Sequence, residues 1–127
     1  MAVFASASEV DDAIGGMFRE ALHTVPIGDD LAASGVVLQL RLRKPDVVLT
    51  IDMPNRAVYT GDDGPDPTMV LKADTDVAHE YWLGEVNVGV AITRGRIRVK
   101  GSVPTLIRLA GLLKPLFPIY RERMSAA

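Results

Sequence analysis

The chain has 127 residues, 48% of them hydrophobic, which is enough for one buried core, and a single domain over residues 1–127 is predicted. It contains no cysteine, which excludes disulfides and thiolate catalysis, and we expect no transmembrane helix, no signal peptide and a cytoplasmic location. The net charge of −2 is unevenly distributed, because residues 1–85 hold fifteen acidic and six basic side chains whereas residues 86–127 hold one acidic and eight basic ones.

The N-terminal region favours an amphipathic helix followed by an irregular segment. The helix is predicted over Ser8–Leu22, with its first residue as N-cap and an acidic residue three positions later. Its apolar stripe consists of Ile14, Met17, Phe18 and Leu22. The pair Gly15-Gly16 opposes this prediction, because each glycine costs roughly 1 kcal/mol relative to alanine inside a helix. Pro26 and Gly28 break the pattern, so residues 27–34 are predicted to form a loop or a short turn.

Three strands joined by short turns are predicted next. Residues 36–43 and 47–53 alternate apolar and polar side chains, which is typical of strands with one buried face, and residues 56–60 (R-A-V-Y-T) form the third predicted strand. The expected inward residues are Leu38, Leu40 and Leu42, then Val47, Leu49, Ile51 and Met53. Because the two connections are short and contain proline, the strands are predicted to form an antiparallel meander.

An acidic loop and a further strand and helix follow the meander. Residues 61–67 contain three aspartates, but their spacing lacks the alternation and closing glutamate of an EF-hand, so an exposed turn is favoured and no metal is expected. Residues 68–73 are predicted to form a fourth strand. The helix from Asp74 to about Leu83 should begin with carboxylates that accept from free backbone N–H groups, and should end at Gly84 in the left-handed conformation.

A strand with a strongly basic face is predicted at residues 95–100, and residues 87–93 before it fit either a short helix or a strand. The basic side chains are Arg94, Arg96, Arg98 and Lys100. Aromatic stacking partners are missing from this stretch, so we expect a solvated sheet face and no nucleic-acid partner. We expect its charges to be neutralised by the acidic part of the chain; binding of phosphates or of an anionic membrane surface is the alternative.

The last predicted helix is unusually apolar. It begins after Ser102, a suitable N-cap, runs to about Leu113, and continues only if it kinks at Pro115, with Pro118 ending or kinking it again. Apolar side chains surround it instead of forming a stripe: Leu106, Ile107, Leu109, Leu112, Leu113, Leu116 and Phe117. Such a helix either fills the core, lines a cavity or forms an interface.

The sequence contains no set of residues that indicates catalysis. His23 and His79 fall on separate predicted helices without metal-ligand spacing, and no nucleophile elbow, Walker loop or dinucleotide motif occurs. A lipid site needs none of these, because burying a dozen methylenes gains roughly 10 kcal/mol, and several kcal/mol of lost freedom still leave about micromolar affinity. We therefore expect a protein that is not an enzyme and has no cofactor; a catalyst that only orients an apolar substrate is a weaker alternative.

Residues 68–113 combine several features of one known family. A strand ending in Lys72-Ala73-Asp74 leads into an acid-capped helix, and the stretch Thr93-Arg94-Gly95 leads into Arg96–Gly101, which is followed by an apolar helix. The last strand stands where that family has a Gly-Lys-hydrophobic-Lys-hydrophobic-x-Gly pattern. In these features the chain resembles the SCP-2 (sterol carrier protein 2) sterol-binding domain family. The first 35 residues and the extension Leu116–Met124 depart from the family pattern.

The resemblance implies an α/β (α+β) fold in which a five-stranded sheet is covered on one face by helices, in the element order α-β-β-β-β-α-β-α. It also implies an apolar tunnel between sheet and helices for a fatty acid, acyl-CoA, sterol or phospholipid, with Ile97 and Val99 expected to contribute to its floor. The candidate ligand-binding residues are Tyr81, Trp82, Val88, Ile92, Leu106, Leu109, Leu113 and Phe117. The candidates for contact with a headgroup are Arg56, Arg94 and Arg108.

The expected function is therefore the binding or transfer of a lipid or other apolar small molecule. The alternative is an interaction or accessory module that dimerises, or docks on an enzyme of lipid or quinone metabolism, through its C-terminal apolar segment. A transient membrane contact and a homodimer are compatible with both functions.

Overall fold

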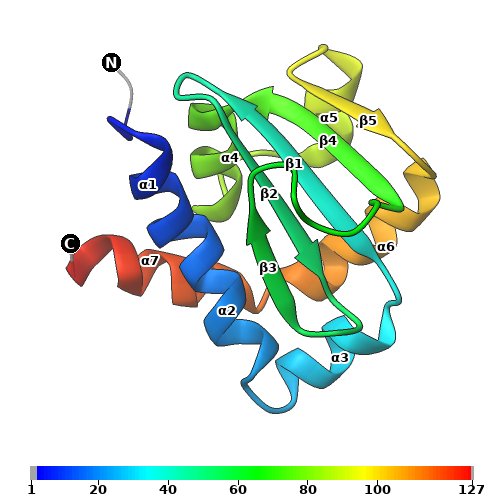
Figure 1. Ribbon diagram of the computed structural model, residues 1–127. Coiled ribbons are helices and arrows are strands. Elements are labelled where there is room, and N and C mark those ends of the chain that lie inside the picture. Colours follow the sequence, from blue (N-terminus) through cyan, green and yellow to red (C-terminus); the bar gives the residue numbers. More distant parts are fainter. Residues whose placement is uncertain (1–2, 127) are drawn as a thin grey trace.

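The N-terminal helix is continuous but changes its winding (Figure 1). The computed structural model describes residues 3–126, so residues 1, 2 and 127 of the predicted domain lie outside the described residues. The helix consists of α1 (Ala7–Val10), the π-helical turn η1 (Asp11–Gly15) and α2 (Gly16–Leu22). Its N-cap is Ser6, whose Oγ accepts from the Glu9 N–H at 3.3 Å, so the predicted cap at Ser8 is wrong by two positions.

The Gly15-Gly16 pair lies where this helix packs against α7 (Leu116–Ala126). A Cβ on Gly16 would collide with the guanidinium group of Arg123, and a Cβ on Gly15 would lie 2.6 Å from Asp11 Oδ1. Arg123 in turn donates to the main-chain carbonyl of Asp12 at 3.0 Å. Gly16 therefore allows close packing against α7, and Gly15 leaves room for the Asp11–Arg19 ion pair of its own helix. Both effects offset the low helix propensity of glycine.

A helix, α3 (Ile27–Ala33), occupies the segment that was predicted to be a loop, so that prediction is wrong. Pro26 stands at its N-cap, before the first helical residue, where a missing N–H group costs no helical hydrogen bond. Gly28 is buried in the first turn of α3 and packs against the end of α2. A Cβ at this position would overlap the main-chain carbonyl of Leu22. The two apparent helix breakers thus permit a tight corner between α2 and α3.

Within residues 3–126 the strands form a five-stranded sheet in the order β3-β2-β1-β4-β5. The strands are β1 (Val37–Arg43), β2 (Val47–Asp52), β3 (Ala57–Thr60), β4 (Met69–Asp74) and β5 (Ile97–Lys100). The first three form the predicted antiparallel meander, β4 pairs in parallel with β1, and β5 pairs antiparallel with β4. The segment after β3 packs on the outer face of the sheet, where Gly64 lies against Thr50 and Tyr59.

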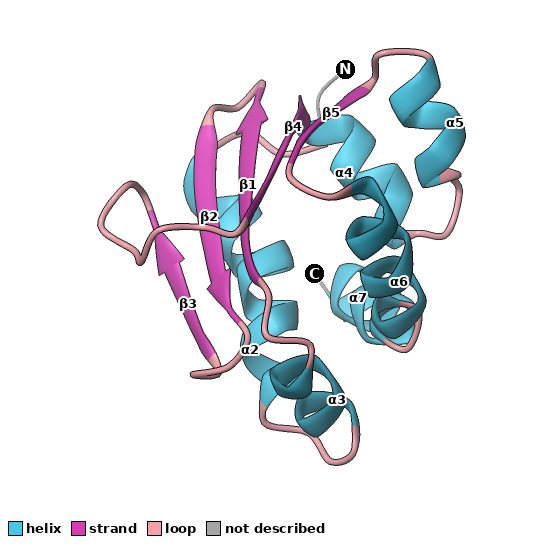
Figure 2. Ribbon diagram, turned by 90° about the vertical axis from the view of Figure 1, so that its right-hand side faces the viewer, coloured by secondary structure: helices cyan, strands magenta, loops and turns pink. Residues whose placement is uncertain are grey.

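The helices cover one face of this sheet (Figure 2), as predicted. The helices after the meander are α4 (Thr75–Trp82), α5 (Val88–Thr93), α6 (Val103–Leu113) and α7. The core lies between the two layers, and the inward residues of β1, Leu38, Leu40 and Leu42, are at most 6% exposed. Part of its helical side is the predicted stripe of the N-terminal helix, whose four residues are fully buried. The α/β fold is thereby confirmed.

The two ends of α4 differ in how well the sequence predicted them. Asp74 stands at the N-cap, but its carboxylate accepts no bond from the helix N–H groups and pairs with Arg43 instead. This hydrogen bond lowers the pKa of Asp74. Because the carboxylate accepts no helix N–H, its predicted role as a capping side chain is wrong. Gly84 has φ +82° after the last turn, and the predicted left-handed end is confirmed.

Between α4 and the end of the chain, the structure decides the points that the sequence left open. Residues 88–93 form a helix because Asn87 Oδ1 accepts from the Val90 N–H at 3.0 Å and caps it. α6 begins at its predicted cap, Ser102, and stops at Leu113. Pro118 does not end the chain's last helix, since it lies in the first turn of α7, which continues to Ala126.

Candidate functional site

An apolar pocket lies between the inner face of the sheet and the helices. β1, β4 and β5 form its floor, and α4, α5 and α6 supply the opposite wall. Its lining consists of Leu38, Leu40, Leu42, Leu71, Ala73, Val77, Ala78, Tyr81, Trp82, Val88, Ile97, Leu106 and Leu113. The cavity volume is about 60 Å³, which corresponds to about two water molecules. Typical ligand pockets hold about 300 Å³ or more, so this pocket is smaller than a typical ligand site.

Five of the eight predicted ligand-binding residues line this pocket: Tyr81, Trp82, Val88, Leu106 and Leu113. The other three lie outside its lining. Leu109 is buried in the core, and Ile92 packs half-buried against the core from α5. Phe117 of α7 packs against two lining residues without lining the pocket itself. Its ring is edge-on to Tyr81 and Trp82 at centroid distances of 5.5 and 6.1 Å.

The floor of the pocket is the part that the prediction of site residues largely missed. Its unpredicted members are Leu38, Leu40, Leu42, Leu71 and Ala73; in the opposite wall, Val77 and Ala78 of α4 were also missed. The signal for the first three was present, because the alternation of β1 already placed them on the inner face. Ile97 belongs to the lining as expected, whereas Val99, which was expected with it, does not.

Aromatic rings close the side of the pocket that faces α2 and α7. Trp82 is 3% exposed and meets Phe18 and Tyr81 edge-on at 5.3 and 4.9 Å. Offset and edge-on ring pairs of this kind contribute about 0.5–1.5 kcal/mol beyond their buried area. Burial raises the pKa of Tyr81 to about 12, so its phenol stays neutral at physiological pH.

The two histidines occupy unlike environments. His79 Nδ1 lies 2.7 Å from the hydroxyl of Tyr120, and this bond ties α4 to α7. Phe4 packs edge-on against the same imidazole at 5.6 Å. His23 is exposed at the end of α2. The contacts of His79 thus give it a structural role between two helices.

The three arginines considered for a headgroup lie outside the lining of the pocket. Arg56 donates to the Leu22 carbonyl at 2.9 Å and pairs with Asp29 at 2.7 Å, so it fastens the β2–β3 turn to the α2–α3 corner. Arg94 is exposed at the end of α5, and Arg108 is exposed on α6.

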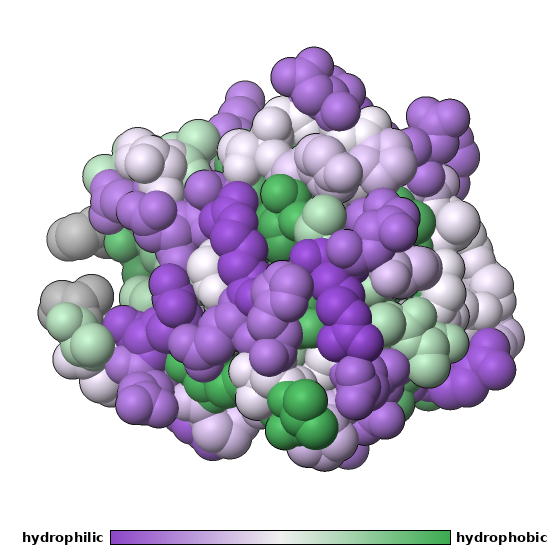
Figure 3. All heavy atoms as spheres, turned by 60° about the horizontal axis from the view of Figure 1, so that its bottom comes forward, coloured by the Kyte–Doolittle hydropathy of each residue, from purple (hydrophilic) through white to green (hydrophobic). Residues whose placement is uncertain are grey.

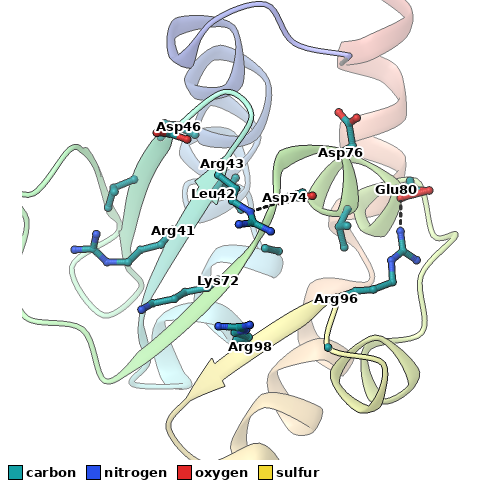
Figure 4. A pocket seen from close by; sticks show the side chains of 15 residues that line it. Arg41, Leu42, Arg43, Asp46, Lys72, Asp74, Asp76, Glu80, Arg96 and Arg98 are labelled. Carbon is teal, nitrogen blue, oxygen red and sulfur yellow. Dashed lines mark hydrogen bonds and ion pairs between the residues drawn. The ribbon is translucent and has the colours of Figure 1, made fainter. Parts of the chain in front are cut away.

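A wider, polar hollow adjoins the apolar pocket (Figure 4). It has a volume of about 930 Å³ and lies over the ends of β1 and β4 and the start of β5. Its charged lining residues are Arg41, Arg43, Asp46, Lys72, Asp74, Asp76, Glu80, Arg96 and Arg98. Leu42, Ala73 and Val77 line both hollows.

The basic side chains of the C-terminal part remain largely unneutralised. Among residues 3–126, Arg96 pairs with Glu80 at 2.9 Å and Arg123 with Glu20 at 3.7 Å. The other six basic residues after position 85 form no ion pair within this range. The expected neutralisation across the fold is therefore wrong for most of them.

A sheet with helices on one face around an apolar pocket places the chain among small α/β domains with an internal apolar site. The model of the SCP-2 sterol transfer family matches residues 27–114. The chain belongs to this family, in agreement with the resemblance of residues 68–113.

Solved structures agree with this fold. Sterol carrier protein 2 from Yarrowia lipolytica, in its apo form, is 18% identical, with a TM-score of 0.72 over 90% of this chain and 96% of that chain. The ubiquinone synthesis protein UbiJ-SCP2 is 17% identical, with a TM-score of 0.63 over 91% and 96%. Sterol carrier protein 2 from Aedes aegypti, in complex with the C16 fatty acid palmitate, is 18% identical, with a TM-score of 0.61 over 85% and 94%. No curated protein matches the sequence.

Proposed function

We propose that this protein binds and transfers a hydrophobic ligand, such as a fatty acid, acyl-CoA, sterol or phospholipid, without catalysing a reaction. The observation that carries the proposal is the pocket between the sheet and α4–α6, whose lining is built from aliphatic and aromatic side chains. Membership of the SCP-2 sterol transfer family supports it, as does the palmitate complex of the Aedes aegypti protein.

The small volume of the pocket has a consequence for binding. A lipid chain needs several times the 60 Å³ of the pocket, so the helical wall must move away from the sheet when the ligand enters. The cost of this opening reduces the affinity, but each buried methylene returns about 0.8 kcal/mol. Affinity should therefore increase steeply with chain length.

Chain-length dependence gives the test of this proposal. Trp82 is the single tryptophan and lines the pocket, so its fluorescence reports on occupancy. Titration with octanoate, dodecanoate and hexadecanoate should show affinity increasing by up to about fourfold per methylene. Native mass spectrometry of the purified protein should also detect co-purified lipid. A protein that carries no lipid and binds all three acids equally weakly would refute the proposal.

The alternative, a docking module that acts through the C-terminal apolar segment, has less support. Leu116 and Tyr120 of that segment are 0% exposed because α7 packs on the chain's own core. In the view from below Figure 1, apolar atoms form separate patches between hydrophilic side chains (Figure 3). The larger exposed apolar residues of α6 are Val103 and Ile107, at 44% and 50%. Light scattering of an Ile107→Ser variant tests this alternative, which predicts a dimer that dissociates.

A further inference from the structure

The segment between β3 and β4, residues 61–67, makes one half of the outer face of the sheet raised and acidic. This acidic loop lies on the face of the sheet opposite to the helices (Figures 1 and 2), and its Gly64 packs against side chains of β2 and β3. Its three aspartates are exposed. Asp62 pairs with β1, whereas Asp63 and Asp66 form no ion pair among residues 3–126.

The other half of the same face, over β4 and β5, is basic and hollowed. Lys72 of β4 lies directly opposite Arg98 of β5, and Lys100 lies two residues further along β5 on the same face. All three are exposed, and none forms an ion pair with another residue between positions 3 and 126. Lys72 and Arg98 line the polar hollow of about 930 Å³ (Figure 4). Like charges directly opposite each other are destabilising, so this basic half favours a negatively charged partner.

The acidic loop and the basic half lie at the same level along the strands. Asp62 pairs at 2.9 Å with Arg41, whose row across the sheet continues to Lys72 and Arg98. The middle of the loop packs over the next outward row, which ends at Lys100. The two charged regions are therefore separated across the strands and not along them. A two-fold axis parallel to the strands, above β1, would place the acidic loop of each copy over the basic half of the other.

We propose that the outer face of the sheet binds a second copy of this chain, in a symmetric dimer in which the acidic loop of each copy enters the polar hollow of the other. Both contacts form at once, because a two-fold interface is self-complementary. A nucleic acid or an anionic membrane fits this face less well, since either would also meet the exposed Asp63 and Asp66. The net charge of −2 is small, so overall repulsion between two copies is weak.

The size of the face predicts a weak dimer. Five strands about 4.8 Å apart, with six residues of about 3.3 Å each in β2 and β4, give a face of about 24 by 20 Å. This is about 480 Å² per copy, below the roughly 800 Å² of a standard interface. Sedimentation velocity at up to about 1 mM protein should show a monomer–dimer equilibrium in about 0.05 M salt and mostly monomer in about 0.5 M salt.

Charge reversal tests which surfaces meet in the dimer. Lys72→Glu/Arg98→Glu and Asp63→Lys/Asp66→Lys should each weaken dimerisation at least about tenfold, because each brings like charges together. An equimolar mixture of the two variants should dimerise again, since both contacts between unlike chains then join opposite charges. A chain that carries all four substitutions keeps the wild-type net charge and should also dimerise.

The matched control is Lys114→Glu/Arg121→Glu, which reverses two exposed cations on the helical side of the molecule and should dimerise as the wild type does. Circular dichroism checks that each variant is folded. If a reversed variant is not folded, Lys72→Gln/Arg98→Gln should weaken the dimer in the same direction.

Three outcomes would overturn the inference. A wild type that stays monomeric at about 1 mM in low salt has no such interface. Variants of the outer face that remain as dimeric as the control indicate an interface elsewhere. If both variants are monomeric and neither their mixture nor the fourfold variant dimerises, the acidic loop and the basic half do not meet. Loss of binding to phosphatidylserine vesicles by Lys72→Glu/Arg98→Glu would then assign the basic half to an anionic membrane.

Discussion

Replacing Ala73 with valine tests whether the apolar pocket holds the ligand chain. Ala73 faces inward on β4, between Leu42 of β1 and Ile97 of β5, and lines the pocket. Filling the whole cavity of 60 Å³ would stabilise the fold by about 1.4 kcal/mol, at roughly 24 cal/mol per Å³. Two added methyl groups fill most of it, and valine suits a strand, so we expect a gain of about 1 kcal/mol and a Tm higher by roughly 4 °C.

The same substitution should weaken ligand binding. The two methyl groups exclude about two methylenes of the ligand chain, which costs about 1.6 kcal/mol, or about fifteenfold in Kd. Thermal unfolding followed by circular dichroism measures the first effect, and titration of Trp82 fluorescence with hexadecanoate measures the second. A simultaneous gain in stability and loss of affinity distinguishes pocket filling from general disruption, which lowers both.

The matched control is Ala57→Val, the same change on β3 at the other edge of the sheet. It should leave the Kd for hexadecanoate at the wild-type value. If Ala73→Val binds hexadecanoate as tightly as this control does, the chain does not occupy the pocket, and the reasoning from its lining fails.

Three further predictions concern the scaffold. Gly28→Ala should lower the free energy of unfolding by several kcal/mol, because the added Cβ overlaps a main-chain carbonyl of α2. Gly111→Ala places its Cβ in open space within α6 and should raise the free energy of unfolding by about 0.5–1 kcal/mol. Urea unfolding measures both changes, and equal effects of the two substitutions contradict the packing argument. Tyr120→Phe removes the bond to His79 and should cost about 1 kcal/mol in the same assay, so an unchanged midpoint rules out a stabilising bond. Burial raises the pKa of Tyr81 to about 12 from 10.0, so the contribution of its neutral phenol to stability is complete below about pH 10 and is lost as the pH rises towards 12. Tyr81→Phe should therefore flatten the decline in Tm between these two pH values. A decline as steep as that of the wild type contradicts this prediction.

The parts of the fold that the sequence predicted well are those with a strict local period. The meander could be predicted because a period of two and two short turns leave antiparallel pairing as the simple solution. α3 could not, because Pro26 and Gly28 are helix breakers by propensity, and their compatibility with a helix depends on where α2 ends. Residues 88–93 were undecided for a similar reason, since the side-chain cap from Asn87 decides in favour of a helix over a strand.

The candidate site was predicted on its helical side better than on its sheet side. The apolar surface of α6 indicated a cavity or core, and Leu106 and Leu113 do line the pocket. Leu109 is equally buried, but its place on the helix directs it to the core outside the pocket lining. The floor depends on β4 and β5 joining β1, a long-range arrangement that no local pattern specifies.

Strand order also explains why the expected charge neutralisation fails. The three aspartates of residues 61–67 follow β3, at one edge of the sheet, and Arg41 on the central strand β1 is close enough to pair with Asp62. Arg98 lies on β5 at the opposite edge, four strands away from β3 at about 4.8 Å per strand, which is beyond the reach of a surface ion pair. Counting charges along the chain predicts neutrality, but the sheet separates the aspartates of this loop from β5 by nearly its full width. The unpaired cations are therefore a product of topology, and they lie on the strands whose inner faces form the floor of the apolar pocket.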